Sequence, residues 1–384
     1  MAKTTIHQNQ PSVAIDKMNQ MRPAYLEINL RAFAENFKII RGIMGKTANL
    51  MTVIKANAYG HGLIPIAQAA EKCGADFLGV ALIEEGEQLK KAGIKTPVVV
   101  LYPELPERAA RLVRADLIAT ACDWEYLESL SHAGLTSGKT VKAFLKLESG
   151  MGRYGLPSAE LIQLARAAAK LPAIKIIGVS TNLADSSNHD SELTQKQFAE
   201  FSSLALGDFN FEYSGIENSG GLLYNHHEKY NLVRVGIVLY GVSPNGKLPD
   251  GIEPVMSLKS RIVQLKKWPA GRPIGYGGHY TPKRDSLIAT IPLGYADGYP
   301  WALSNKGIAL VGGKRVPVVG RVCMDALMLD VNDVPQVKTG DEVVLMGQQG
   351  SQKIGAEEIA AAAGSFPYEL ISCFADRLPR IYVE

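Results

Sequence analysis

Eight short apolar runs, rich in β-branched residues, recur between residues 50 and 245 at intervals of 20 to 35 positions, and this periodicity constrains the fold more than any other feature. Each run is followed by a polar turn and a segment with apolar residues at three- and four-residue spacing, which predicts a helix. A doubly wound open sheet would give the same local pattern, but eight strand–helix units favour a (β/α)8 TIM-type barrel. The runs are MTVIKA (51–56), FLGVAL (77–82), PVVVLY (97–102), LIATAC (117–122), VKAFLKL (141–147), IKIIGVS (174–180), FNFEYSG (209–215) and VGIVLYG (235–241).

The helical periodicity ends beyond residue 250, and short strands broken by Gly, Pro and Asp follow. This pattern predicts an antiparallel β domain with hairpins, a tight turn at 312–313 and one helix over 354–364. The segment YLEINLRAF (25–33) alternates like a strand, so it either pairs with the distant β domain or opens an extra helix. We therefore predict a polar N-terminal extension (1–22), a barrel (23–250) and a C-terminal antiparallel β domain (251–384).

Charge and cysteine usage narrow the class of partner. The 41 basic and 38 acidic residues give a net charge of +3, too small for the field that nucleic acid or an anionic membrane usually meets. The four cysteines form no CxxC pair, so we predict no disulfide framework and no metal site, and a reducing cytoplasm fits them best. No secretory signal or membrane span is recognisable. We expect a soluble cytoplasmic protein, and nothing in its charge calls for a polyanionic partner.

The segment TVIKANAYGHG (52–62) places Lys55 at the C-terminal end of the first predicted strand, where barrel enzymes carry their catalytic groups. A lysine there can simply extend its amine into solvent. Desolvated in a pocket, the same amine loses its proton more easily, as Schiff-base chemistry with an aldehyde cofactor requires.

Seven motifs make the chain resemble the alanine racemases, fold type III enzymes that depend on pyridoxal 5′-phosphate (PLP). Their order and spacing match from residue 23 to residue 384. The resemblance implies a PLP-binding barrel with a C-terminal β domain, a homodimer with shared active sites, and interconversion of L-alanine and D-alanine that supplies D-alanine for cell-wall peptidoglycan. The motifs are VIKANAYGHG (53–62), SGMGRYG (149–155), ENSGG (217–221), VRVGIVLYG (233–241), IGYGGHY (274–280), GYADGYP (294–300) and GRVCMD (320–325).

The resemblance also assigns the cofactor contacts. Lys55 would bind PLP through its amine, and Tyr59 would reach the phosphate. Ser219 and the backbone amides of Gly236 and Ile237 would complete the phosphate cup, which falls after the seventh and eighth runs, where barrels commonly hold phosphate. Without the resemblance, Ser219 would be a plain turn serine.

Arg234 matches the arginine that faces the pyridine nitrogen. A guanidinium does not give up its proton, so the ring nitrogen stays largely unprotonated. The ring would then stabilise a carbanion less, which would disfavour side reactions such as transamination. Standing alone at the mouth of a strand, Arg234 would be interpreted as part of a surface ion pair.

Racemisation needs one base on each face of the substrate Cα. The resemblance assigns Lys55 to the D enantiomer and Tyr276, donated by the partner subunit, to the L enantiomer. Arg153 would lie near the substrate carboxylate and lower the pKa of the catalytic tyrosine. Lys146 matches a lysine that is often carbamylated, and the modified side chain would position Arg153.

The last two motifs would shape the substrate site from the β domain. The backbone N–H of Met324, on the partner chain, would contact the substrate carboxylate. Without the resemblance, the Met324 side chain would be interpreted as part of the hydrophobic core. Tyr295 would line the narrow entrance, and Asp297 would order that corridor.

The chain departs from the family pattern at three positions. Asn182 stands where many relatives carry a histidine beside the pyridine ring, and Gly215 replaces the histidine that commonly supports the ring-facing arginine. Asp376 stands where some members carry a tyrosine that narrows the substrate pocket, or it is simply a loop acid paired with Arg377 or Arg380. The departures leave open a racemase of broader or shifted specificity, for serine, lysine or arginine.

Two other functions are disfavoured. A non-catalytic PLP carrier would have no use for Tyr276, Arg153 or the β domain. A decarboxylase of the same architecture would carry C-terminal acid and cysteine motifs that are missing here, whereas the GYG and CMD motifs are intact.

Overall fold

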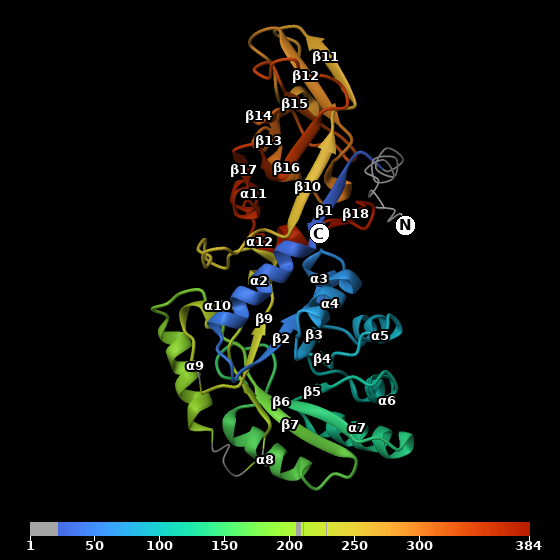
Figure 1. Cartoon of the computed structure of the whole chain (residues 1–384), viewed down its shortest axis with the longest axis vertical. Coiled ribbons are helices and arrows are strands. Elements are labelled where there is room, and N and C mark those ends of the chain that lie inside the picture. The colour runs from blue at the N-terminus through green and yellow to red at the C-terminus, as the bar shows by residue number, and fades with distance from the viewer. Residues whose placement is uncertain (1–21, 205–208, 210, 228) are drawn as a thin grey trace, which may run out of the picture. The chain divides into compact units, whose positions relative to one another are not determined.

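The computed structural model describes residues 22–204, 209, 211–227 and 229–384 (Figure 1). These residues divide into two compact units. The barrel unit is Asn29–Val255, and the β unit combines the described residues up to Ile28 with Met256–Val383. Apart from Arg22, the predicted polar extension lies outside the described residues.

Within the described residues of the barrel unit, eight strands pair in parallel. Their order is β4-β3-β2-β9 in one half and β5-β6-β7-β8 in the other. A parallel bridge between Val99 and Ile118 joins the halves at β4 and β5. The strands are β2 (Asn49–Val53), β3 (Phe77–Val80), β4 (Val98–Val100), β5 (Ala119–Ala121), β6 (Val141–Lys146), β7 (Ile174–Ser180), β8 (Tyr213–Gly215) and β9 (Leu232–Val235).

The interior of the barrel is a packed core. Each strand, or the residue at its edge, contributes one large side chain to a single apolar cluster, and this convergence of distant segments closes the sheet on itself. The predicted (β/α)8 barrel is therefore confirmed. The cluster contains Met51, Phe77, Val99, Ile118, Phe144, Ile177 and Leu232, with Tyr213 packed against it.

Helices cover the outside of the strands (Figure 1). They are amphipathic and bury one face each; α7, for example, begins after Asp123, whose carboxylate accepts the N–H of Tyr126 at 2.7 Å. The helices of this unit are α2 (Leu30–Ile43), α3 (Lys55–Tyr59), α4 (Leu63–Lys72), α5 (Ile83–Lys91), η1 (Pro106–Arg108), α6 (Ala109–Arg114), α7 (Trp124–Ser137), α8 (Ser158–Ala168), α9 (Glu192–Ser203), α10 (Ser219–Tyr224) and η3 (Ile237–Tyr240). None of the helices in the described ranges has both the length and the hydropathy needed to cross a membrane.

The eighth strand differs from the prediction. The expected run was 235–241, whereas β9 ends at Val235 and residues 237–240 form the 3-10 helix η3. The prediction followed the longest unbroken apolar stretch, but the strand itself contains the charged residue Arg234. That side chain is buried by tertiary contacts, so apolar continuity was the wrong guide to the position of the strand.

The β unit is an antiparallel sheet in the order β11-β12-β15-β14-β13-β16-β10-β1-β18, with β17 paired to β16. The tight turn at 312–313 is confirmed, because it joins β13 to β14 with Val311 opposite Lys314. The predicted helix over 354–364 is α11 (Ala356–Ala363). The remaining elements are β10 (Met256–Arg261), β11 (Gln264–Trp268), η4 (Tyr276–Gly278), β12 (Ser286–Ile291), η5 (Tyr295–Asp297), η6 (Trp301–Leu303), β13 (Ile308–Val311), β14 (Lys314–Val319), β15 (Leu327–Asp330), β16 (Glu342–Gln349), β17 (Gln352–Ile354), α12 (Pro367–Ser372) and β18 (Arg380–Val383).

Residues 25–33 do both things that their pattern allowed. β1 (Tyr25–Asn29) pairs antiparallel with β10, with Leu26 opposite Leu258. The Asn29 side chain then caps α2 by accepting the N–H of Ala32 at 2.9 Å. The alternation predicted the strand, and the N-cap asparagine ends it.

Candidate active site

Lys55 begins α3, directly after β2, and the backbone that follows it is unusual. The residues from Ala56 to Tyr59 all have φ between 52° and 55°, in the left-handed region. For residues other than glycine this conformation costs about 1–2 kcal/mol each. A run of four therefore needs support from the surrounding structure, as strained segments at functional sites generally do.

Glu85 in the first turn of α5 supplies that support. Its buried carboxylate accepts the N–H of Ala56 at 2.6 Å through one oxygen. The other oxygen accepts the N–H groups of Ala81 at 2.8 Å and Leu82 at 3.2 Å. The turn after Lys55 is thereby tied to the end of β3. Sequence reasoning missed Glu85, because only the folded chain brings Ala56 to it.

Replacing Glu85 by glutamine should lower the free energy of unfolding by about 1–3 kcal/mol. The amide can accept through one atom only, so its NH2 group would face a backbone N–H. Chemical denaturation of the purified protein measures the loss. The matched control is Glu84→Gln in the same helical turn. Glu84 pairs with Arg108 and Arg111 near the surface, and its loss should change the free energy of unfolding by less than about 1 kcal/mol. Equal losses in the two variants would contradict a special role for the Glu85 contacts.

The amine of Lys55 donates a hydrogen bond to the hydroxyl of Tyr102 at 2.7 Å. Tyr102 follows β4, and the guanidinium of Arg153 lies 5.4 Å from the centre of its ring. Burial acts to raise the pKa of Tyr102, but the positive charges of Lys55, Arg153 and Arg234 outweigh it and leave that pKa lowered. The sequence analysis did not single out Tyr102. A signal was present, because Tyr102 ends the third predicted strand at the same barrel face as Lys55.

Hydroxyl and backbone donors converge beside this turn. The N–H of Gly236 donates to the hydroxyl of Ser219 at 3.1 Å. A Cβ atom at position 236 would lie 2.6 Å from the Tyr59 hydroxyl oxygen, so only glycine permits this close approach. Ile237 follows at the start of η3. The structure thus brings four predicted phosphate-binding residues together, and their N–H and O–H groups suit a phosphate.

Arg234 is buried and firmly held. It donates to the carbonyl oxygens of Thr181 and, at 3.3 Å, Ile216. Both terminal nitrogens also reach the side-chain oxygen of Asn182 at 3.4 Å. Burial lowers the pKa of Arg234 to about 10, which leaves the guanidinium charged near neutral pH. The departure at Asn182 therefore supports the arginine directly.

The departure at Gly215 has a steric reason. A Cβ at this position would lie 2.7 Å from the carbonyl oxygen of Leu232, so a histidine would require the backbone to move. The carbonyl groups of Thr181 and Ile216 and the side chain of Asn182 hold Arg234 instead.

The Nε atom of Arg234 is buried and has no hydrogen-bond partner in the described structure. A buried donor without a partner calls for an explanation, and an acceptor supplied by another molecule provides one. A pyridine nitrogen is such an acceptor. Together with the phosphate donors and the amine of Lys55, this orphaned N–H makes the site fit PLP.

Lys146 and Arg153 lie in the same unit as Lys55. Lys146 ends β6 and is buried; burial, reinforced by the charges of Arg234 and Arg153, lowers the pKa of its amine well below the ordinary value. Arg153 is exposed, and its backbone N–H donates to Glu148 at 3.2 Å. The aromatic rings beside the Arg153 guanidinium in this unit are those of Tyr102 and Tyr154.

The other predicted site residues belong to the β unit. Tyr276 lies in η4 with its side chain 71% exposed. Two backbone hydrogen bonds join the loops that carry Tyr295 and Met324: the N–H of Tyr295 donates to Cys323, and the N–H of Ala296 donates to Met324, both at 3.0 Å. These two motifs, distant in sequence, are therefore neighbours.

Asp297 organises the loop that carries Tyr295. Its fully buried carboxylate accepts hydrogen bonds from Arg22 at 2.5 and 2.7 Å and from the N–H of Gly294 at 3.0 Å, and pairs with Arg377 at 2.9 Å. Asp376, in contrast, is 95% exposed and pairs with Arg380 at 3.5 Å. The simpler interpretation of Asp376, a loop acid in an ion pair, agrees with this geometry.

Comparison with known proteins decides the family. The alanine racemase N-terminal domain matches residues 28–244, and the alanine racemase C-terminal domain matches residues 255–382. The chain belongs to the alanine racemase family. The resemblance of the motifs is thereby confirmed.

Similar proteins cover nearly the whole length. The alanine racemase of Halothermothrix orenii is 40% identical over 94% of this chain and 97% of its own. That of Symbiobacterium thermophilum is 38% identical over 95% and 98%. Among solved structures, Clostridium difficile 630 alanine racemase has 32% identity and a TM-score of 0.90, covering 95% of this chain and 96% of its own. Bartonella henselae alanine racemase with covalently bound pyridoxal phosphate has 29% identity and a TM-score of 0.86, covering 94% and 100%.

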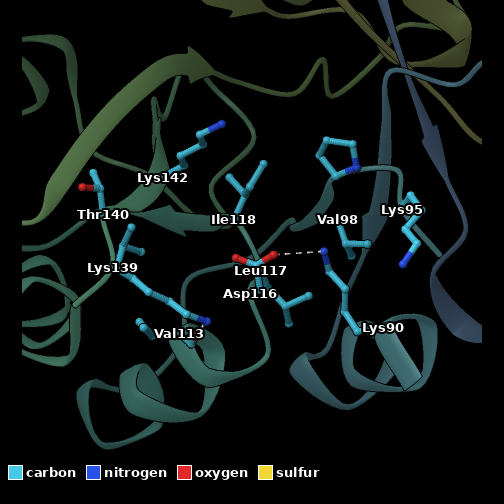
Figure 2. A pocket seen from close by; sticks show the side chains of 12 residues that line it. Lys90, Lys95, Val98, Val113, Asp116, Leu117, Ile118, Lys139, Thr140 and Lys142 are labelled. Atoms are coloured by element: carbon cyan, nitrogen blue, oxygen red, sulfur yellow. Dashed lines mark hydrogen bonds and ion pairs between the residues drawn. The ribbon is translucent and has the colours of Figure 1, made fainter. Parts of the chain in front are cut away.

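A cationic hollow of about 200 Å³ lies at the opposite, N-terminal ends of β4, β5 and β6 in this alanine racemase fold (Figure 2). Lys90 pairs there with Asp116 at 3.5 Å, and Lys139 donates to the carbonyl of Val113 at 3.3 Å. None of the predicted site residues lines this hollow.

Proposed function

We propose that this chain is a PLP-dependent alanine racemase that works as a homodimer in the cytoplasm and supplies D-alanine for peptidoglycan. The observation that carries the proposal is the arrangement around Lys55. Its amine lies in one unit with converging phosphate donors and the buried, unpartnered Nε of Arg234. Bound PLP would withdraw electrons from the substrate Cα and make its proton removable.

The residues of the barrel unit would hold the cofactor. Tyr59, Ser219, Gly236 and Ile237 would bind the phosphate through hydroxyl and backbone donors. Arg234 would donate Nε–H to the ring nitrogen and keep its own proton, since its pKa of about 10 lies well above neutral pH. The ring would stay weakly electron-withdrawing, which favours return of the proton over side reactions.

Two bases would move the proton at Cα. We assign one face to the Nζ atom of Lys55 and the other to the hydroxyl of Tyr276 of the partner subunit. The 71% exposure of the Tyr276 side chain supports its donation to another subunit. Arg153 and the backbone N–H of Met324 of the partner subunit would bind the substrate carboxylate, and Tyr295 would line the entrance.

Lys146 is the candidate for carbamylation. Addition of carbon dioxide to an amine requires the unprotonated form, which burial of Lys146 favours. The resulting anion would be placed among the positive charges of Arg153 and Arg234, and would position Arg153.

The function is tested by racemisation rates across L-alanine, L-serine, L-lysine and L-arginine, with chiral chromatography of the products. We expect alanine to exceed every other substrate by more than about a hundredfold. The control is Asp376→Ala, which should leave this ranking unchanged because the side chain is 95% exposed and pairs with Arg380. Comparable rates for serine or a cationic amino acid would instead support the alternative of shifted specificity, and no racemisation of alanine would contradict the proposal.

A further inference from the structure

We propose that Tyr102 is a positioning residue for Lys55: its phenolic oxygen holds the Lys55 amine whenever that amine is free, and exchanges a proton with it. The inference rests on the proposed function for its catalytic meaning. The contact itself is independent of that function, because it joins two side chains of the same unit.

The geometry makes Tyr102 the partner of the amine. The Nζ atom of Lys55 lies 2.7 Å from the Tyr102 oxygen, and in the described structure this is its one hydrogen bond. The same nitrogen lies 5.2 Å from the centre of the Tyr102 ring, so the amine is at the edge of the phenol. Lys55 and Tyr102 follow β2 and β4, two strands that both pair with β3, and this puts their ends at one rim of the barrel.

The ring of Tyr102 is held in place without help from Lys55. It packs against Tyr154 with the ring centroids 5.1 Å apart and an interplanar angle of 32°. The guanidinium of Arg153 lies 5.4 Å from the Tyr102 ring and 5.9 Å from that of Tyr154. The N–H of Leu101 donates to Val80 at 2.9 Å, which anchors the preceding backbone to β3. A fixed phenol can orient a flexible lysine side chain, whereas the flexible lysine could not orient the phenol.

The charges around the phenol suit proton exchange. Lys55, Arg153 and Arg234 face it from three different segments of the chain, and together they favour its ionised form against burial. In the exchange, the phenolate oxygen takes a proton from the Lys55 ammonium, giving a phenol and a neutral amine, and the reverse transfer restores the pair. No other bond changes. The neutral amine is the form that can accept a proton from a substrate or attack an aldehyde.

The first test uses the protein without cofactor, so it does not depend on turnover. The ionisation of tyrosine is followed by ultraviolet difference absorbance during a pH titration of the wild type, Tyr102→Phe and Lys55→Ala. Phenylalanine keeps the ring stack, so Tyr102→Phe should fold normally. We expect the wild type to show one tyrosine that ionises below the ordinary range, and Tyr102→Phe to lose it. In Lys55→Ala that ionisation should move to higher pH, because a facing positive charge is gone.

The matched control is Tyr154→Phe, which removes the neighbouring hydroxyl but keeps the stacked ring. Its titration should show the early-ionising tyrosine unchanged. If the early ionisation persists in Tyr102→Phe, or is unaffected by Lys55→Ala, the two groups do not exchange a proton and the inference is wrong.

The second test separates positioning of Lys55 from a general structural effect in the holoenzyme. The equilibrium constant between the enantiomers is one, so any variant must change kcat/KM equally in both directions, and rates alone are uninformative. Isotope effects measured with alanine deuterated at Cα can change differently in the two directions. In Tyr102→Phe we expect a fall in kcat/KM of about tenfold to a hundredfold, a larger isotope effect from D-alanine and a smaller one from L-alanine, because only the Lys55 step slows.

The isotope effects also separate failure of the inference from failure of the proposed function. If Tyr102→Phe leaves both isotope effects as in the wild type, Tyr102 does not position Lys55. If the wild type does not racemise alanine at all, the proposed function fails, while the titration still decides whether Tyr102 holds the amine.

Discussion

Replacing Lys55 by alanine is expected to remove the visible absorption of the bound cofactor and to lower racemisation by more than about 10⁴-fold. The variant loses the amine that would attach PLP and, with it, the base on one face of the substrate. The amine lies at the barrel rim, where it donates a hydrogen bond to Tyr102. Absorbance spectra with added PLP and a chiral assay of alanine measure the two losses separately.

The matched control is Lys72→Ala. Lys72 is an exposed lysine in the last turn of α4, so the variant removes the same charge without touching the barrel rim. It should keep the spectrum and the activity of the wild type. Added methylamine should partly restore turnover in Lys55→Ala, because it supplies a diffusible amine. A Lys55→Ala protein that retains the cofactor band would show that another residue anchors PLP.

Replacing Tyr276 by phenylalanine should keep the cofactor spectrum and lower racemisation by about 10²–10⁴-fold. Only a hydroxyl is removed from an exposed side chain, so the fold is expected to persist. The variant retains Lys55, which is assigned to D-alanine. D-alanine should therefore still exchange its Cα hydrogen with deuterium from heavy water, whereas L-alanine should not. Proton magnetic resonance follows the exchange.

Tyr280→Phe, in the same glycine-rich motif, is the control for that experiment and should behave like the wild type. Loss of exchange from both enantiomers in Tyr276→Phe would contradict the assignment of one base to each face. So would unimpaired racemisation.

Co-expression tests whether Tyr276 acts across a dimer. A mixed dimer of Lys55→Ala and Tyr276→Phe subunits would contain one site with both wild-type residues if the tyrosine comes from the partner. Random pairing would then restore about one quarter of wild-type activity. If Tyr276 served the Lys55 of its own chain, each subunit would lack one base and the mixture would stay inactive.

Much of this molecule follows from local patterns. Each barrel strand must bury both faces, one against the interior cluster and one against a helix, so its apolar run is visible in the sequence. That requirement made the barrel predictable, although it misplaced the eighth strand, whose Arg234 is buried against carbonyl groups of other segments. The β domain was equally predictable from the sequence, because hairpin turns such as 312–313 need glycines.

The conformation of the turn that follows Lys55 could not be predicted from the sequence. The sequence KANAY contains no glycine, and its residues locally favour a right-handed helix or a strand. The left-handed turn exists because Glu85, 29 positions from Ala56, accepts its N–H, and because Asn57 accepts the N–H of Leu63 at 2.8 Å. Only the folded chain supplies those acceptors.

The sequence by itself determined the barrel and the β domain and predicted the residues to which we assign racemase chemistry, because these depend on periodicity and on motifs that are contiguous in the chain. The tertiary structure alone decided which groups meet. The 2.7 Å contact between Lys55 and Tyr102, the hold of Asn182 on Arg234 and the support of Glu85 for Ala56 all join segments that lie far apart in sequence. Such contacts depend on how neighbouring strand ends align at the barrel rim, and closure of the barrel, not local propensity, sets that alignment.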